Sequence, residues 1–303
     1  MLVDGHWVDK GYDTAATGGR FVRSETSFRS TLAAGGPYPP AVGRYHLYVS
    51  LACPWAHRTL IMRALKGLES AVEVSAVAPL MLEHGWQFDD AHPDRLYGAR
   101  YLHQLYTRAQ PTYSGRVTVP VLWDKQSGQI VNNESAEIVR ILDQAFDGLG
   151  ARPGSFYPEP LRDEIDQVNQ RVYEDVNNGV YKAGFATSRE AYEEAVDALF
   201  VALDWLEQRL SGRDYLVGGR LTEADIRLFT TLVRFDAVYY THFKCNLRRI
   251  ADYPNLRALR RRIYDLPGVA ATVDLQTIKQ HYFGSHRTIN PSGIVPKGPL
   301  EWL

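Results

Sequence analysis

Cys53 is the residue with the clearest chemical potential in this 303-residue sequence. It lies between a β-rich run, YHLYVS, and a stretch with a helical period that begins at Pro54. The free amides and the dipole at such a helix start stabilise a thiolate, so we expect a pKa below the free-cysteine value of ~8.5. Position 56 is Ala, which excludes a Cys-x-x-Cys dithiol. The sequence therefore predicts a reactive thiol that works alone or with a small thiol.

Two further motifs each have two interpretations. In TVPVL, Pro120 indicates either a strand edge or a cis-proline whose neighbour Val119 offers its backbone to an extended peptide ligand. Asn133, Glu134 and Ser135 indicate a helix start, where a simple N-cap is worth ~1 kcal/mol. Alternatively, Glu134 takes an ammonium group, and Ser135 with the helix amides takes a carboxylate. The γ-glutamyl end of glutathione carries both groups.

Other candidates are weaker. His57 lies four residues after Cys53 on the same helical face, which suggests a Cys-His dyad, but a thiol at a helix start needs no base. Cys245 lies in an apolar, aromatic segment, and we expect it to be structural. Two cysteines and nine scattered histidines show no metal-ligand spacing. One basic cluster is interpreted as a solvated helix face rather than a nucleic-acid site: Arg257, Arg260, Arg261 and Arg262.

The composition is that of a globular protein, with 45% hydrophobic and 23% charged residues. The net charge of -1 gives no overall field to recruit nucleic acid or an anionic membrane. The N-terminus, MLVDGHWVDK, has acidic residues where a signal peptide needs an apolar run, and no segment approaches the ~20 apolar residues of a membrane span. With only two cysteines, the sequence predicts a cytoplasmic protein.

The elements that must position Cys53 form a small α/β domain. We expect three strands, in YHLYVS, VEVSAVAPL and VTVPVLWD (interrupted by Pro120), and helices from Pro54 and in NNESAEIVRILDQAF. A Thr222–Asp225 capping box lies in the helical segment that follows. The predicted boundaries are an irregular arm at 1–44, the α/β domain at 45–150, an all-helical domain at 155–285 and a tail at 286–303. Four aromatic residues of the arm should pack on later elements: Trp7, Tyr12, Phe21 and Phe28.

The order of these motifs resembles that of glutathione transferases. Finer motifs resemble the Xi class, the glutathionyl-hydroquinone reductases, from about residue 4 to residue 286. They are GGRFVRSETSFRS, GRYHLYVSLACPWAHRTLI, GWQF, VTVPVLWD, NNESAEI, NNGVYKAGFA, RFDAVYYTHFKCN and HYFGSH. The resemblance implies a thioredoxin-like α/β N-terminal domain, an all-α C-terminal domain and a homodimer. It implies no metal, with glutathione as co-substrate.

The resemblance also implies an activity and its residues. Glutathionyl-hydroquinones would be reduced to hydroquinones through a Cys53–glutathione mixed disulfide, with release of oxidised glutathione. Tyr181 would be the general acid, and Tyr239, with Tyr240 as a rival, and Tyr282 would donate hydrogen bonds to the thiolate. Glutathione would contact Trp86, Arg116, Val117, Thr118, Val119, Glu134 and Ser135. Two alternatives are a glutaredoxin-like thiol transferase or dehydroascorbate reductase, and a non-catalytic ligand-binding protein.

Overall fold

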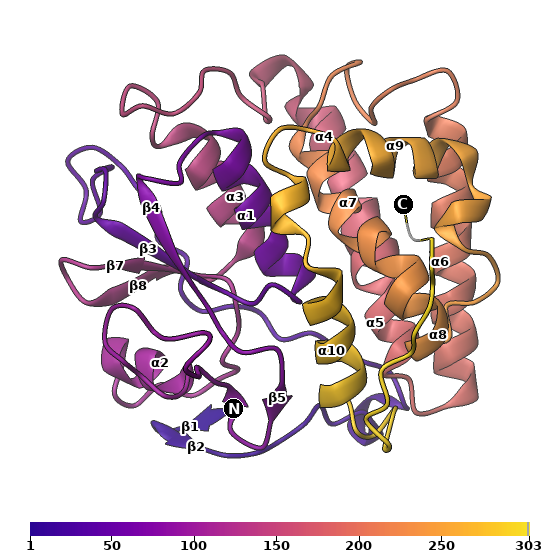
Figure 1. Cartoon of the computed structure of the whole chain (residues 1–303), viewed down its shortest axis with the longest axis horizontal. Helices are drawn as coiled ribbons and strands as arrows, with labels where there is room; N and C mark the ends of the chain where they lie inside the picture. Colours follow the sequence, from indigo (N-terminus) through magenta and orange to yellow (C-terminus); the bar gives the residue numbers. More distant parts are fainter. Residues whose placement is uncertain (302) are drawn as a thin grey trace. The chain divides into compact units, whose positions relative to one another are not determined.

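The chain folds into two compact units in the computed structural model, which describes every residue except residue 302 (Figure 1). The sheet unit comprises Met1–Gly11, Ser24–Gly154 and Ala271–Thr277. The helical unit comprises Tyr12–Arg23, Ser155–Ala270 and Ile278–Leu303. The chain therefore passes from one unit to the other five times. The domain boundaries expected from the sequence stay a prediction.

The sheet unit is built on four strands in the order β4-β3-β7-β8. They are β3 (Tyr45–Val49), β4 (Val72–Ala76), β7 (Val121–Asp124) and β8 (Gln129–Asn132). β3 pairs parallel with β4 and antiparallel with β7, and β7 pairs antiparallel with β8. α1 (Pro54–Leu65) connects β3 to β4, α3 (Ser135–Gln144) follows β8, and the two helices lie side by side (Figure 1). The predicted α/β architecture is confirmed.

The third predicted strand begins later than expected. β7 starts at Val121, so the predicted strand in VTVPVLWD, interrupted by Pro120, is confirmed after this proline and wrong before it. Proline has no amide hydrogen to donate to a sheet, which favours a strand start just after it. The Val119–Pro120 peptide bond is cis, as one of the two interpretations of this motif expected.

The arm packs on elements that come later in the sequence. It contains the hairpin β1 (Leu2–Val3) and β2 (His6–Trp7), and the Trp7 ring stacks on His103 with centroids 4.9 Å apart. His103 begins α2 (His103–Ala109), which follows a second hairpin, β5 (Met81–Leu82) and β6 (Gly85–Trp86). Gly85 has φ +70°, and a Cβ there would lie 2.6 Å from the Trp7 ring, so this position requires glycine.

One arm segment also covers the edge of the sheet. The amide of Ser30 donates to the carbonyl of Val131, and the amide of Asn133 donates to the carbonyl of Phe28, both at 3.0 Å. Segment 28–30 thereby pairs with β8, the last strand of the sheet. Exposed strand edges promote aggregation, so this pairing protects the sheet.

The helical unit is a bundle of helices joined by turns and loops (Figure 1). No helix of the residues that the structure describes is long and apolar enough to cross a membrane. The predicted capping box of Thr222 and Asp225 is confirmed at the start of α7. The α-helices and π-helical turns are α4 (Arg162–Arg171), η3 (Val172–Asn177), α5 (Gly179–Gly184), α6 (Arg189–Arg209), α7 (Glu223–Arg234), η4 (Phe235–Tyr239), α8 (Tyr240–His242), α9 (Pro254–Tyr264) and α10 (Leu275–Ser285), whose first three residues belong to the sheet unit. The single 3-10 turns are η1 (Ala15–Thr17), η2 (Glu159–Leu161), η5 (Ile250–Asp252) and η6 (Ala270–Thr272), whose last two residues belong to the sheet unit.

One member of the basic cluster on α9 is not solvated. Arg260 is 1% exposed, and its Nη1 lies 3.0 Å from Oδ2 of Asp236. The Asp236 carboxylate also accepts the amides of Ile250 and Ala251. The prediction of a solvated face is therefore wrong for Arg260, because a carboxylate from another helix supplies the partner that a buried charge requires.

Candidate active site

Cys53 occupies the N-cap position of α1, directly before Pro54. Its backbone is extended, and its carbonyl accepts the amide of His57, which belongs to the first turn. The side chain is 8% exposed, and Sγ donates to the carbonyl oxygen of Val119 over 3.7 Å. The structure therefore brings together two of the predicted markers, the helix-start thiol and the residue before Pro120.

Tyr106, which the sequence analysis missed, ties this loop to the start of α3. Its hydroxyl donates to the Thr118 carbonyl at 2.9 Å and accepts the Thr118 amide at 3.2 Å and the Asn133 side-chain amide at 3.2 Å. Burial raises the pKa of Tyr106 to about 12 against these opposing hydrogen bonds, so the phenol is neutral. One buried hydroxyl thus fixes the backbone before Val119 relative to the residue before Glu134.

Glu134 and Ser135 lie where α3 begins. Glu134 is the N-cap, and its Oε1 accepts the amide of Ala136 at 3.0 Å. The Ser135 hydroxyl accepts a hydrogen bond from Nη1 of Arg58 at 3.4 Å. The Arg58 guanidinium lies 4.6 Å from the centroid of the Trp55 ring and is 1% exposed. The N-cap interpretation is confirmed, while recognition of a γ-glutamyl group stays a prediction.

The remaining predicted glutathione contacts lie in the same unit. Trp86 is buried in β6, and its carbonyl accepts the amide of Leu102. The Arg116 guanidinium donates to the carbonyls of Lys10 and Gly11, each at 2.6 Å, so this side chain holds the N-terminal arm. Val117 and Thr118 are half-buried in the segment that leads to Val119. The ligand-binding roles of these residues stay predictions.

The three predicted tyrosines meet at their hydroxyl groups in the helical unit. The Tyr282 hydroxyl lies 2.6 Å from that of Tyr181 and 2.9 Å from that of Tyr239. Tyr239 is fully buried, whereas Tyr240 is partly exposed, so it is Tyr239 that joins this tyrosine cluster. Burial, reinforced by the two neighbouring phenols, raises the pKa of Tyr282 well above its usual range.

The tyrosine cluster depends on two π-helical turns. Tyr181 follows η3 by four residues, and Tyr239 is the last residue of η4. A π turn places an extra residue in the helix and rotates the residues that follow, and such turns are frequent at functional sites. The helical period of the sequence predicted helices here but not these turns. Cys53 belongs to the sheet unit and the tyrosine cluster to the helical unit.

The weaker candidates have structural roles. Nε2 of His57 forms a hydrogen bond with the Thr272 hydroxyl at 2.8 Å. Cys245 is fully buried, and burial raises the pKa of its thiol, as expected of a structural cysteine. Over residues 1–301 and 303, the His, Cys, Asp and Glu side chains form no group of three that could hold a metal ion.

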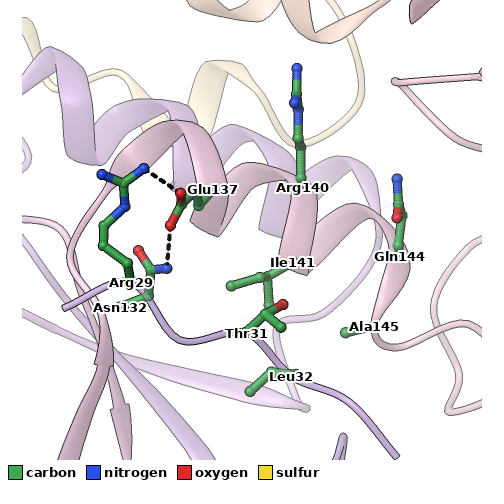
Figure 2. A pocket seen from close by; sticks show the side chains of 9 residues that line it. All are labelled: Arg29, Thr31, Leu32, Asn132, Glu137, Arg140, Ile141, Gln144 and Ala145. Carbon is green, nitrogen blue, oxygen red and sulfur yellow. Dashed lines mark hydrogen bonds and ion pairs between the residues drawn. The ribbon is translucent and has the colours of Figure 1, made fainter.

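A surface hollow of about 450 Å³ lies between the arm and α3 (Figure 2). At one end, Arg29 and Asn132 both reach the carboxylate of Glu137, as Figure 2 shows. Leu32 and Ile141 supply apolar surface. None of the predicted site residues lines this hollow, so it is separate from the thiol site.

The chain is similar to known proteins over both of its halves. Residues 52–145 match the glutathione S-transferase N-terminal domain, and residues 189–262 match the glutathione S-transferase C-terminal domain. The chain is 60% identical to the glutathionyl-hydroquinone reductase PcpF of Sphingobium chlorophenolicum, covering 100% of this chain and 97% of PcpF. It is 59% identical to the glutathionyl-hydroquinone reductase YqjG of Escherichia coli K12, covering 100% and 96%.

Solved structures agree with these similarities. The glutathione-bound structure of Escherichia coli YqjG superposes with a TM-score of 0.91 at 55% identity, covering 99% of this chain and 96% of YqjG. The glutathione S-transferase Xi of Phanerochaete chrysosporium gives a TM-score of 0.91 at 53% identity, covering 94% of each chain. Both similarities extend over nearly the whole length of the proteins.

Proposed function

We propose a function from one premise: the chain belongs to the glutathione S-transferase family and, within it, to the Xi-class glutathionyl-hydroquinone reductases. The protein reduces glutathionyl-hydroquinones to hydroquinones, with glutathione as the reductant and oxidised glutathione as the second product. The observation that carries this proposal is the full-length identity of 60% to PcpF. The position of Cys53 at the start of α1 supports it, because such a thiol is suited to nucleophilic attack.

The reaction divides into two steps at Cys53. In the first, the thiolate attacks the glutathionyl sulfur, so that an S–S bond forms and the bond from sulfur to the aromatic carbon breaks. That carbon keeps the electron pair and takes a proton from Tyr181, which gives the hydroquinone and a Cys53–glutathione mixed disulfide. In the second step, the thiolate of another glutathione attacks this disulfide and frees Cys53. Each step is easier than a single concerted displacement.

The γ-glutamyl end of glutathione lies at the start of α3. There Glu134 takes its ammonium group, and the Ser135 hydroxyl with the first amides of the helix takes its carboxylate. The backbone of Val119 pairs with the peptide, and the 3.7 Å between Cys53 Sγ and the Val119 carbonyl supports a position for the ligand sulfur beside the nucleophile. Trp86 and segment 116–118 flank the ligand.

The three hydroxyls of the tyrosine cluster donate a proton or stabilise the thiolate. Tyr181 is the acid, and Tyr239 and Tyr282 donate hydrogen bonds that stabilise the thiolate. The hydrogen bonds of 2.6 and 2.9 Å through Tyr282 support a shared proton network. Burial of Tyr239 and Tyr282 strengthens each electrostatic interaction there.

Mass spectrometry of Cys53 tests the proposal directly. We expect incubation with a glutathionyl-hydroquinone, without free glutathione, to yield one hydroquinone and one protein-bound glutathione at Cys53. Initial rates with both substrates should give the parallel lines of a ping-pong mechanism. Faster turnover of a small mixed-disulfide substrate than of any glutathionyl-hydroquinone would identify a glutaredoxin-like thiol transferase instead. An unreactive Cys53 would indicate a non-catalytic binding protein.

We also propose a homodimer that works in the cytoplasm. Reduced glutathione is the co-substrate, and it is abundant where cysteines such as Cys53 and Cys245 stay reduced. Light scattering at working concentration tests the dimer, and a mass equal to the 34.3 kDa chain would exclude it.

A further inference from the structure

Arg23, in the N-terminal arm, lies against the proposed acid Tyr181. The carbon Cζ of its guanidinium is 5.1 Å from the centroid of the Tyr181 ring. Its Nε donates to Oδ1 of Asn178 at 2.9 Å, and Asn178 precedes Tyr181 by three residues. Both partners belong to the helical unit, to which the arm segment Tyr12–Arg23 also belongs.

Several interactions hold this arm segment in place. The amide of Thr187 donates to the Gly19 carbonyl, and the Ser188 hydroxyl donates to the Gly18 carbonyl, both at 3.0 Å. Arg20 forms an ion pair with Glu194 at 2.7 Å. A Cβ on Gly19 would lie 2.6 Å from the Ser188 hydroxyl, so the close approach of the two backbones depends on glycine.

An aromatic layer continues this attachment to Tyr181. Phe21 is buried, its ring stacks on Phe185 with centroids 5.5 Å apart, and it lies 6.2 Å from the ring of Tyr181. The Arg23 guanidinium also lies over Phe21, 5.4 Å from its centroid. The guanidinium is therefore held by a hydrogen bond and by two aromatic faces, in one defined position.

We propose that Arg23 is a positioning residue for Tyr181, which it orients and whose phenolate it stabilises in the proton-transfer step. This inference rests on the proposed function. A cation over an aromatic face is attracted by the ring electrons, and it stabilises the negative charge that appears when the phenol gives up its proton. The hydrogen bond to Asn178 fixes the guanidinium relative to the helix that carries Tyr181.

The charged and titratable groups near Tyr181 act differently from Arg23. The buried Arg234 donates from Nη1 to the Thr230 carbonyl at 2.8 Å, and its charge bears on Tyr282, whose pKa it lowers against the larger effect of burial. Tyr282 from α10 and Tyr239 from η4 face it as phenols, which are neutral at pH 7. Lys182, its neighbour on α5, directs its ammonium group to the carbonyl of Glu174. Loss of Arg23 should therefore affect proton donation, which belongs to the first step, and should spare the attack of glutathione on the mixed disulfide.

Rapid-quench measurement of the two steps tests this inference. We expect Arg23→Gln to slow formation of the Cys53–glutathione disulfide about tenfold, within the range of desolvated cation–aromatic interactions, and to leave its resolution by glutathione unchanged. Arg23→Lys, which keeps the charge, should recover most of the lost rate. Arg20→Gln, which loosens the arm but keeps Arg23, is the matched control and should change neither step.

A second measurement needs no substrate. With tyrosine labelled at the ring carbon that bears the hydroxyl, the signal of Tyr181 can be assigned from Tyr181→Phe and titrated by NMR. We expect Arg23→Gln, and not Arg20→Gln, to move its midpoint up by about 0.5 to 1 pH unit. Unchanged first-step rate and midpoint in Arg23→Gln, or equal effects in Arg20→Gln, would overturn the inference. Absence of the mixed disulfide in the unmodified protein would instead contradict the proposed function.

Discussion

At the scale of single residues, the two cysteines lie in different surroundings. Cys53 caps a helix and lies beside a backbone carbonyl at the edge of solvent, where it is 8% exposed. Cys245 is fully buried, and burial raises the pKa of its thiol. The thiolate is the nucleophilic form, so we expect Cys53 to react and Cys245 to stay inert.

The first prediction follows from this contrast. Iodoacetamide at pH 7 should alkylate Cys53 within minutes while Cys245 stays unmodified, which peptide mass mapping can measure. Cys53→Ser should abolish the reductase activity, because serine cannot form the mixed disulfide. Cys245→Ser is the matched control and should keep full activity per folded molecule. Equal labelling of the two thiols would show that Cys53 is not activated.

Tyr106→Phe is the second prediction. The substitution keeps the buried ring but removes the hydroxyl that joins Thr118 to Asn133. We expect the KM for glutathione to rise about fivefold to tenfold with kcat nearly unchanged, because a lost buried hydrogen bond is worth about 1–3 kcal/mol and loosens both sides of the proposed peptide site.

Tyr45→Phe is the control for this change. Tyr45 is equally buried, and its hydroxyl donates to the carbonyl of Pro39 at 2.7 Å. This variant should lose comparable stability in urea and keep its KM. A similar rise in KM for both variants would show that Tyr106 acts only through global stability.

Which residues could be foreseen depended on where their partners lie. Cys53 and Pro54 are adjacent, so the helix start was readable from local sequence. Arg23, Tyr106 and Arg260 were not, because their partners Tyr181, Asn133 and Asp236 lie 24 to 158 residues away. A sequence shows that an arginine is present, but only the fold shows whether a carboxylate or an aromatic ring meets it.

At the scale of secondary structure, the turn between β7 and β8 is organised by one carboxylate. Asp124 accepts two hydrogen bonds from Arg44, each at 2.7 Å, and one from the Ser127 hydroxyl at 2.7 Å. Burial raises the pKa of Asp124, but the bonds from Arg44 and Ser127 outweigh this effect and lower it to about 2. The ionised carboxylate thus ties the turn after β7 to Arg44, the residue before β3.

Asp124→Asn is the third prediction. We expect the free energy of unfolding at pH 7 to fall by about 2 kcal/mol, because the charge pairing with Arg44 is lost. The carboxylate has a lower pKa in the folded state than its usual value near 4, so its contribution is present above ~4 and is lost as the pH falls through about 2. The difference between variant and unmodified protein should therefore shrink between pH 7 and pH 3 in urea unfolding.

Asp252→Asn provides the comparison. Asp252 forms an ion pair with Arg249 at 2.9 Å, but both side chains are exposed to solvent. The cost should stay below ~1 kcal/mol, as is usual for surface pairs. A cost for Asp124→Asn that is the same at pH 7 and pH 3 would refute the role assigned to its charge.

The elements themselves were largely predictable, with one systematic omission. The apolar run of β3 and the stripe of α1 gave their positions almost to the residue, because burial on one face leaves a periodic pattern. The π turns η3 and η4 left no such pattern, since one extra residue shifts the helical period without changing the residue types. η3 precedes Tyr181, and η4 ends at Tyr239. The proposed site therefore depends on the parts of the helices that the sequence pattern did not predict.

At the scale of the whole molecule, segments of the two units alternate along the chain. The sheet unit needs segment 28–30 to cover β8 and Ala271–Thr277 to supply the Thr272 partner of His57. The helical unit needs Tyr12–Arg23 from the arm. Local sequence patterns could not predict this alternation. Neither the arm nor segment 271–277 has a pattern that indicates which unit it packs with.

Cooperative unfolding is the fourth prediction. The chain passes between the units five times, so we expect their unfolding to be coupled. We expect a single transition in urea, with the same midpoint by far-ultraviolet circular dichroism and by tryptophan fluorescence, and equal calorimetric and van't Hoff enthalpies. Two separated transitions would show that the units are thermodynamically independent.

The late segment Ala271–Thr277 also has a consequence for the order of events during synthesis. Domains made first usually fold first as the chain leaves the ribosome, at ~5–20 residues per second. The sheet unit is made first but receives its last segment at Thr277, 123 residues after Gly154. The nascent unit therefore waits ~6–25 s without its final piece. During that interval the nascent unit that contains Cys53 lacks its last segment, so it can be bound by chaperones.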